Sequence, residues 1–175
     1  MTKFKLCIFG DSGVGKTSYC RKYLTNVFNE EERMTIGTDL HTTSLEVEGK
    51  TVGLQIWDFA GEEHYKILFP SFVQDAKGGL FMFDTTDTKS LDKINEWLDF
   101  FKDPNNREEF MAPIIMVGTK IDLEDKREVE SDEVIELAKK KKLLGYIECS
   151  SKTGENVQVI MEAITKIMMK NAKLL

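Results

Sequence analysis

Cysteine is scarce in this 175-residue sequence, and the three cysteines, Cys7, Cys20 and Cys149, are widely separated. No CxxC pair and no cysteine–histidine spacing typical of a metal-binding motif occurs. The sequence therefore gives no sign of a disulfide framework or of a metal site formed by neighbouring residues. We expect reduced thiols, packed as small apolar residues in a cytoplasmic protein.

Long apolar runs and excess positive charge are missing as well. No run approaches the roughly 20 apolar residues of a membrane-spanning helix, and the opening run KFKLCIF is a predicted strand. The formal net charge of -6 argues against a surface for nucleic acid. Repeats, low-complexity linkers and a second domain are not evident. We expect one domain over residues 1–175.

Short apolar runs alternate with helical patterns along the chain. Continuous apolar stretches, typical of strands buried on both faces, occur at residues 3–9, 79–84, 114–119 and 146–150. Residues 42–48 and 51–58 flank Gly49 and Lys50 and predict a hairpin. The sequence therefore predicts an α/β fold, a doubly wound, mostly parallel six-stranded sheet with one antiparallel hairpin strand.

Helices are predicted between these strands. Leu91, Ile94, Leu98 and Phe101 recur at helical spacing, and residues 157–168 carry an amphipathic pattern. Ser131 is the predicted N-cap of a further helix, with acids in its first turn and lysines at its end. Residues 102–113, with two prolines, predict a surface loop.

The stretch GDSGVGKT at residues 10–17 fits the pattern GxxxxGK[ST] between a strand and a helix. Its glycines allow a tight turn with N–H groups pointing inward, and the helix N-terminus favours an anion. Lys16 can neutralise β- and γ-phosphates, and the Thr17 hydroxyl suits Mg²⁺. The residues expected to bind the phosphates are Ser12, Gly13, Val14, Gly15, Lys16 and Thr17.

The stretch DFAGEEHY at residues 58–65 brings three carboxylates together. Alone, it fits an acid/base pair, a metal site or a solvated loop. Beside a phosphate-binding loop, Asp58 can hold Mg²⁺ directly or through water. Gly61 can bring a backbone N–H to the γ-phosphate, and Glu62 belongs with the phosphate that leaves. Glu63 and His64 are expected to be solvated, and His41 to lie on the surface at a strand start.

The stretch TKID at residues 119–122 follows another predicted strand. Guanine presents two adjacent donors, N1–H and the N2 amine, and the Asp122 carboxylate can accept from both. Adenine has an acceptor at N1, which a carboxylate repels. The aliphatic stem of Lys120 can lie along the purine plane. The pattern predicts a guanine site.

Five stretches, GDSGVGKT, TIG, WDFAGEE, TKID and CSSKTG, occur in an order and spacing that resembles the Ras superfamily of small GTPases. LQIWDFAG and TIGTD are most similar to the Rab branch. The resemblance implies a small G domain of the P-loop NTPase class. It further implies a switch that binds GTP or GDP with Mg²⁺ and slowly hydrolyses GTP, in vesicle trafficking or signalling.

The resemblance also implies roles for single residues. Phe28 would pack on the guanine, Ser18 would support the α-phosphate, and Thr35 would ligate Mg²⁺ and align the attacking water. Thr119 and residues 150–152, which are Ser150, Ser151 and Lys152, would complete the base site. The implied catalytic residues are Glu62, Lys16 and Thr35, and the implied metal ligands are Thr17, Thr35 and Asp58.

An exchange factor, a GTPase-activating protein and effectors would bind a monomer through residues 29–40 and 58–73. Apart from Arg33 in the first of these segments, no arginine is placed to act on the phosphate within the chain.

Three departures from the family pattern stand out. Glu62 replaces the usual Gln, Thr119 replaces a frequent Asn, and no cysteine follows Cys149. Because prenylation needs a C-terminal cysteine, we expect peripheral membrane attachment only if a lipidated tail lies outside this sequence. Two alternatives remain open, a GTP-binding module that does not hydrolyse and a small-molecule kinase, although the predicted guanine site argues against the kinase.

Overall fold

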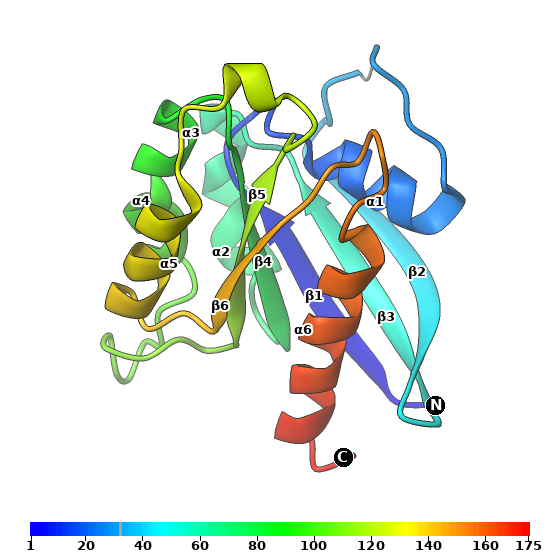
Figure 1. Cartoon of the computed structure of the whole chain (residues 1–175). Helices are drawn as coiled ribbons and strands as arrows, with labels where there is room; N and C mark the ends of the chain where they lie inside the picture. Colours follow the sequence, from blue (N-terminus) through cyan, green and yellow to red (C-terminus); the bar gives the residue numbers. More distant parts are fainter. Residues whose placement is uncertain (32) are drawn as a thin grey trace.

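The computed structural model describes residues 1–31 and 33–175. Its sheet contains β1 (Lys3–Phe9), β2 (Thr38–Val47), β3 (Lys50–Phe59), β4 (Gly78–Asp84), β5 (Ile114–Thr119) and β6 (Gly145–Glu148). The strand order is β2-β3-β1-β4-β5-β6, and only the β2–β3 pair is antiparallel among these strands. The predicted doubly wound, mostly parallel six-stranded sheet is confirmed (Figure 1).

Helices cover both faces of the sheet (Figure 1). The α-helices are α1 (Lys16–Thr25), α2 (Phe69–Phe72), α3 (Lys89–Asp92), α4 (Ile94–Asp99), α5 (Ser131–Lys140) and α6 (Val157–Asn171), and the 3₁₀ turns are η1 (Glu63–Leu68) and η2 (Glu124–Lys126). None of the helices in the described part of the chain has the length and apolarity needed to cross a bilayer.

The core has two layers, one on each face of the sheet. Side chains alternate along β1, so Leu6 and Ile8 pack with α1 and α6, whereas Cys7 and Phe9 face the opposite side. That second layer is rich in aromatic rings, and Trp97 from α4 is completely buried within it. The central position of β1 places the loop after it at the middle of the sheet's carboxyl edge.

The hairpin turn lies one residue earlier than predicted. Val47 pairs with Lys50, so the turn residues are Glu48 and Gly49, both with positive φ (51° and 75°). Two positive φ values fit the right-handed twist of the paired strands, which a glycine permits at low cost. Strand β2 also begins earlier than predicted, at Thr38.

Two details of the predicted helices are wrong. The pattern from Leu91 to Phe101 is divided into α3 and α4 at Lys93, whose ψ of 10° leaves the helical range. Ser131 is the first residue of α5 and does not cap it, because its hydroxyl donates to Glu148 and accepts from Arg127. The partly buried side chain of Glu148 competes successfully for that hydroxyl.

Candidate functional site

The loop between β1 and α1 lies at the carboxyl edge of the sheet and encloses the base of a pocket of about 570 Å³. A volume of this size suits a nucleotide-sized ligand. Gly10 has φ of 144°, and a Cβ there would lie 2.1 Å from the carbonyl oxygen of Met82. Only glycine therefore lets the loop turn this close to β4, which fixes the loop over the strand ends.

Lys16 begins α1 and is almost completely buried. Its Nζ donates hydrogen bonds to the carbonyl oxygens of Gly10, at 2.8 Å, and Asp11, at 2.7 Å. Burial lowers the pKa of the Lys16 ammonium to about 8, opposed by the nearby charges of Asp58 and Glu62. An anion in the pocket would favour the charged form of Lys16.

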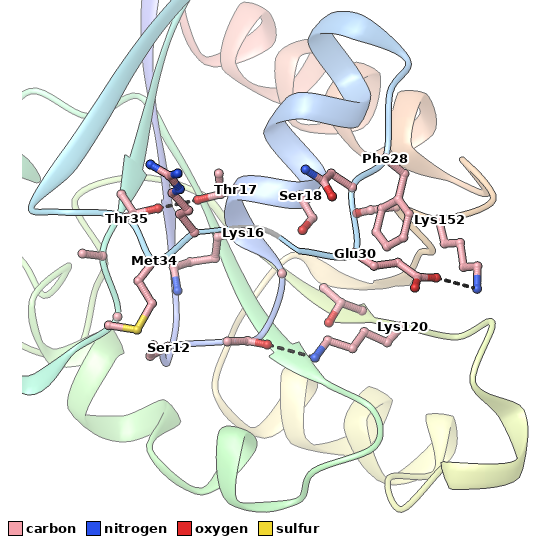
Figure 2. Close-up of a pocket in the computed structure, with 18 of the residues that line it drawn as sticks. Ser12, Lys16, Thr17, Ser18, Phe28, Glu30, Met34, Thr35, Lys120 and Lys152 are labelled. Atoms are coloured by element: carbon pink, nitrogen blue, oxygen red, sulfur yellow. Dashed lines mark hydrogen bonds and ion pairs between the residues drawn. The ribbon is translucent and has the colours of Figure 1, made fainter.

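Oxygen ligands for a hard cation converge beside Lys16. The Thr17 hydroxyl lies 2.5 Å from the Thr35 hydroxyl and donates to Asp58 Oδ2 at 2.5 Å (Figure 2 draws Thr17 facing Thr35). Burial raises the pKa of the Asp58 carboxyl to about 6, against the Thr17 hydrogen bond and the charge of Lys16. Two hydroxyls and a buried carboxylate fit the oxygen preference of Mg²⁺, so these three residues could hold it.

Gly61 and Glu62 lie against the phosphate-binding loop. A Cβ on Gly61 would lie 2.2 Å from the backbone nitrogen of Ser12, so the two backbones approach as closely as glycine allows. Ser12 Oγ donates to Glu62 Oε1 at 2.9 Å, whereas Glu62 Oε2 is shielded from solvent and has no hydrogen-bond partner. The Glu62 carboxylate therefore has one anchored oxygen and one free acceptor.

The other end of the pocket is formed after β5 and β6. Asp122 Oδ1 accepts from Ser150 Oγ at 2.7 Å, and Lys120 Nζ bonds to Asp84 at 2.6 Å and to the Gly13 carbonyl at 2.9 Å. The Thr119 hydroxyl faces the Val14 carbonyl at 2.5 Å and the Phe83 carbonyl at 3.0 Å. The last residue of β5 and the residue after it, which lead to Asp122, are thus bonded directly to the phosphate-binding loop.

The structure brings most of the predicted site residues to one pocket. Those lining it are Ser12, Gly13, Gly15, Lys16, Thr17, Ser18, Phe28, Thr35, Gly61, Glu62, Thr119, Lys120, Asp122, Ser151 and Lys152. Three predicted residues lie behind the lining. Val14 packs its side chain in the core and offers its carbonyl to Thr119, Ser150 holds Asp122, and Asp58 holds Thr17.

Some lining residues were not predicted as ligand contacts. Glu30 forms an ion pair with Lys152 at 3.2 Å across the mouth of the base end (Figure 2). Asn29, Met34 and Leu123 also line the pocket, as does Arg33. These residues belong to loops without a fixed motif, so spacing alone carried no signal for them. Residue 32, within the predicted partner segment 29–40, lies outside the described residues.

The fold and the pocket together define a nucleotide-binding protein of the P-loop class. A strand, a glycine-rich turn and a helix cradle one end of the pocket, and a carboxylate that can pair with guanine lies at the other.

The family model described as the Ras family matches residues 5–170. The chain is 34% identical over 174 residues to the Ras-related protein Rab-18 of Caenorhabditis elegans, covering 99% of this chain and 84% of that protein. It is 34% identical over 171 residues to the Ypt/Rab-type GTPase ypt7 of Schizosaccharomyces pombe, covering 95% and 82%. It is 37% identical over 161 residues to the Ras-related protein RGP2 of Oryza sativa, covering 92% and 72%.

The chain therefore belongs to the Ras family, and its relatives are named Rab proteins in animals and yeast. It is a small GTP hydrolase that binds GTP and GDP with Mg²⁺.

We expect Gly61→Ala to slow GTP hydrolysis by about 100-fold, because the new methyl group forces the backbone away from Ser12 and an error of about 1 Å can cost that much. Single-turnover phosphate release measures the effect. Gly53→Ala, within the preceding strand β3, is the control, since its new Cβ meets the movable side chain of Lys3 at 3.0 Å. Equal rates for both variants would contradict the expectation.

Proposed function

We propose that the whole chain, residues 1–175, is one G domain acting as a Rab-like switch in membrane trafficking. The observation that carries this proposal is one pocket with Lys16 and paired hydroxyls at one end and Asp122 at the other. Segments 29–40 and 58–73, which both reach this pocket, are the proposed surfaces for exchange factors, activating proteins and effectors. Membrane contact would be peripheral.

The residues at the phosphate end of the pocket would have different roles in binding GTP. Lys16 would leave the carbonyls of Gly10 and Asp11 and neutralise the β- and γ-phosphates. Thr17 and Thr35 would hold Mg²⁺ with Asp58 behind them, and the bound cation supplies charge neutralisation on the phosphate oxygens. The N–H groups of residues 12–18 would surround the phosphates.

Release of the γ-phosphate would free Thr35 and Gly61 from it. Both residues lie in the proposed partner segments, so partners would meet a different surface after hydrolysis. Turnover in this reaction class is slow without a partner, roughly 10⁻⁴ to 10⁻² per second. Such a slow rate lets the GTP-bound state persist, and hydrolysis then returns the chain to the GDP-bound state.

Glu62 is the proposed water-orienting residue. Ser12 fixes Oε1, so Oε2 stays free to accept a hydrogen bond from the water that attacks the γ-phosphate. Unlike the glutamine usual in this family, an ionised carboxylate has no N–H to donate to the charged transition state. Glu62 can therefore position the water, but it cannot donate a hydrogen bond to the transition state.

Single-turnover hydrolysis of bound GTP tests this role. We expect Glu62→Ala to slow phosphate release by about 100-fold, the lower end for a positioned acid/base group. Glu62→Gln should release phosphate within about tenfold of the rate of the unchanged protein, because its amide oxygen also accepts from water. Glu63→Gln, at an exposed position, is the control. Unchanged rates in both Glu62 variants would remove Glu62 from the mechanism.

Identification of the nucleotide that co-purifies with the chain tests the proposed switch itself. Chromatography of the released nucleotide should give GDP or GTP, and a time course should convert one to the other. Labelled GTP should be displaced by GTP and not by ATP. Retention of GTP without conversion, even with a lysate that supplies activators, would favour a non-hydrolysing module instead, and displacement by ATP would favour a kinase.

A further inference from the structure

A cluster of three metal-ligand side chains lies directly behind the proposed Mg²⁺ residues. Cys20 comes from α1, His41 from β2 and Asp58 from β3, and their ligand atoms all lie within 4.8 Å of one another. Cys20 and Asp58 are buried, and His41 is half-buried with its Nε2 atom shielded from solvent. His41 was expected on the surface at a strand start, and that prediction is wrong, since His41 is the fourth residue of β2 and is half-buried.

Two atoms of this cluster lack a hydrogen-bond partner. They are His41 Nε2 and Asp58 Oδ1. A buried polar atom left without a partner costs roughly 1–3 kcal/mol, and native proteins rarely leave one unexplained. Asp58 is completely buried, so its free oxygen does not contact bulk solvent. A ligand that interacts with the imidazole and the carboxylate together would satisfy both atoms.

The chemistry of the three groups identifies the kind of ligand. Thiolate, imidazole and carboxylate are the ligands that Zn²⁺ takes in proteins, whereas Mg²⁺ prefers oxygen ligands only. We propose that Cys20, His41 and Asp58 bind one Zn²⁺ ion. Tetrahedral Zn²⁺ ligands lie roughly 3.3–3.8 Å apart, given bond lengths of about 2.0–2.3 Å. Closing the cluster from within 4.8 Å therefore needs only small side-chain movements.

The zinc site shares one residue with the proposed Mg²⁺ site. Asp58 Oδ2 accepts from Thr17, so it faces the nucleotide pocket, while Oδ1 is the oxygen without a partner. Cys20 follows Thr17 by three residues on α1 and lies on the same side of that helix. The Asp58 carboxylate would bridge the two sites, with the pocket on one side and the thiolate and imidazole on the other.

Sharing makes the two cations antagonists. Zn²⁺ neutralises part of the Asp58 charge that would otherwise assist Mg²⁺, and two divalent ions next to one carboxylate repel each other. By linkage, any weakening of Mg²⁺ binding by Zn²⁺ is matched by an equal weakening of Zn²⁺ binding by Mg²⁺. This consequence rests on the proposed function, whereas the zinc site itself does not depend on it.

Cobalt substitution tests the site directly, because Co²⁺ bound by a thiolate gives a charge-transfer absorption band in the near ultraviolet. We expect one equivalent of Co²⁺ to produce this band in the GDP-loaded chain and Zn²⁺ to abolish it by displacement. Cys20→Ser should remove the band. His41→Gln should weaken Zn²⁺ binding by more than about 100-fold, since even outer-shell partners of a metal are worth about 10–100-fold.

The chain offers matched controls for both variants. Cys149→Ser removes another buried cysteine, and His64→Gln removes the other histidine. Both should keep the band and the Zn²⁺ affinity, and thermal melting should show that all four variants fold. Two results would overturn the zinc site. One is the absence of the thiolate band in the unchanged chain. The other is a Zn²⁺ affinity of Cys20→Ser and His41→Gln that equals the affinity of the unchanged chain.

The role of Asp58 is tested without mutating it. Zn²⁺ affinity, measured with a chromophoric chelator, should fall at least about fivefold between low and saturating Mg²⁺ in the GDP-loaded chain, the lower end of typical coupling. An affinity independent of Mg²⁺ would overturn the sharing of Asp58. Because these measurements record cation binding and not hydrolysis, a chain that fails to hydrolyse GTP could still pass them.

Discussion

Replacement of Lys16 by alanine is expected to weaken GTP binding by more than about 100-fold. Lys16 is the buried cation at the phosphate end of the pocket, and a hydrogen bond from a charged group is worth roughly 1.5–3 kcal/mol. Two such bonds to phosphate oxygens give about 3 kcal/mol or more, and each 1.4 kcal/mol corresponds to a factor of ten in affinity. Titration with a fluorescent GTP analogue measures the loss.

Lys22→Ala is the matched control for Lys16→Ala. Lys22 lies on the same helix, and its Nζ bonds only to the Asn26 carbonyl among the contacts that the described residues show. Its replacement should leave GTP affinity within about twofold, because surface changes rarely matter more. Thermal melting should confirm that Lys16→Ala folds. Unchanged GTP affinity in a folded Lys16→Ala chain would contradict the assignment of the phosphate site.

The second large effect is expected at the base end of the pocket. Asp122→Asn should reduce the affinity for GDP by more than about 100-fold, because two charge-assisted hydrogen bonds to guanine are lost. Xanthine carries a carbonyl at C2 where guanine carries an amine, and an asparagine amide can donate to it. The variant should therefore bind xanthosine diphosphate better than GDP, reversing the preference of the unchanged chain.

Competition between the two nucleotides measures this reversal. Asp125→Asn, an exposed aspartate three residues further along, is the control and should keep the preference for GDP. Ser150 can still donate to the side-chain oxygen of an asparagine, so the loop geometry should survive. If Asp122→Asn and Asp125→Asn showed the same preference for GDP over xanthosine diphosphate, a group other than Asp122 would recognise the base.

Much of the fold and of the pocket could be predicted from the sequence because the information was local. Continuous apolar runs identified the buried strands, and the stretch GDSGVGKT fixed a strand, a turn and a helix in a known order. Asp122 could be predicted because one carboxylate matches two adjacent donors of guanine. The β2–β3 pair was predictable from alternation about a glycine, although its turn was placed one residue late.

The remaining features depend on contacts between distant residues. Ser12 fixes Glu62 from 50 positions away, and no spacing rule connects the two residues. Cys20, His41 and Asp58 come from three separate elements, so a search for neighbouring ligands could not find them. The loss of the predicted Ser131 cap has the same origin, since Glu148 on another element takes the hydroxyl.

The two bonds from the end of β5 to the phosphate-binding loop have a further consequence. Thr119 reaches the Val14 carbonyl and Lys120 reaches the Gly13 carbonyl, two residues before Asp122 completes the base end. These bonds hold the phosphate-binding loop at a fixed distance from Asp122, so the pocket selects ligands by their length. A free guanine base can bind only at the base end, and a bare polyphosphate can bind only at the phosphate-binding loop. A molecule of intermediate length cannot contact both ends, because the bonds between them keep the ends apart.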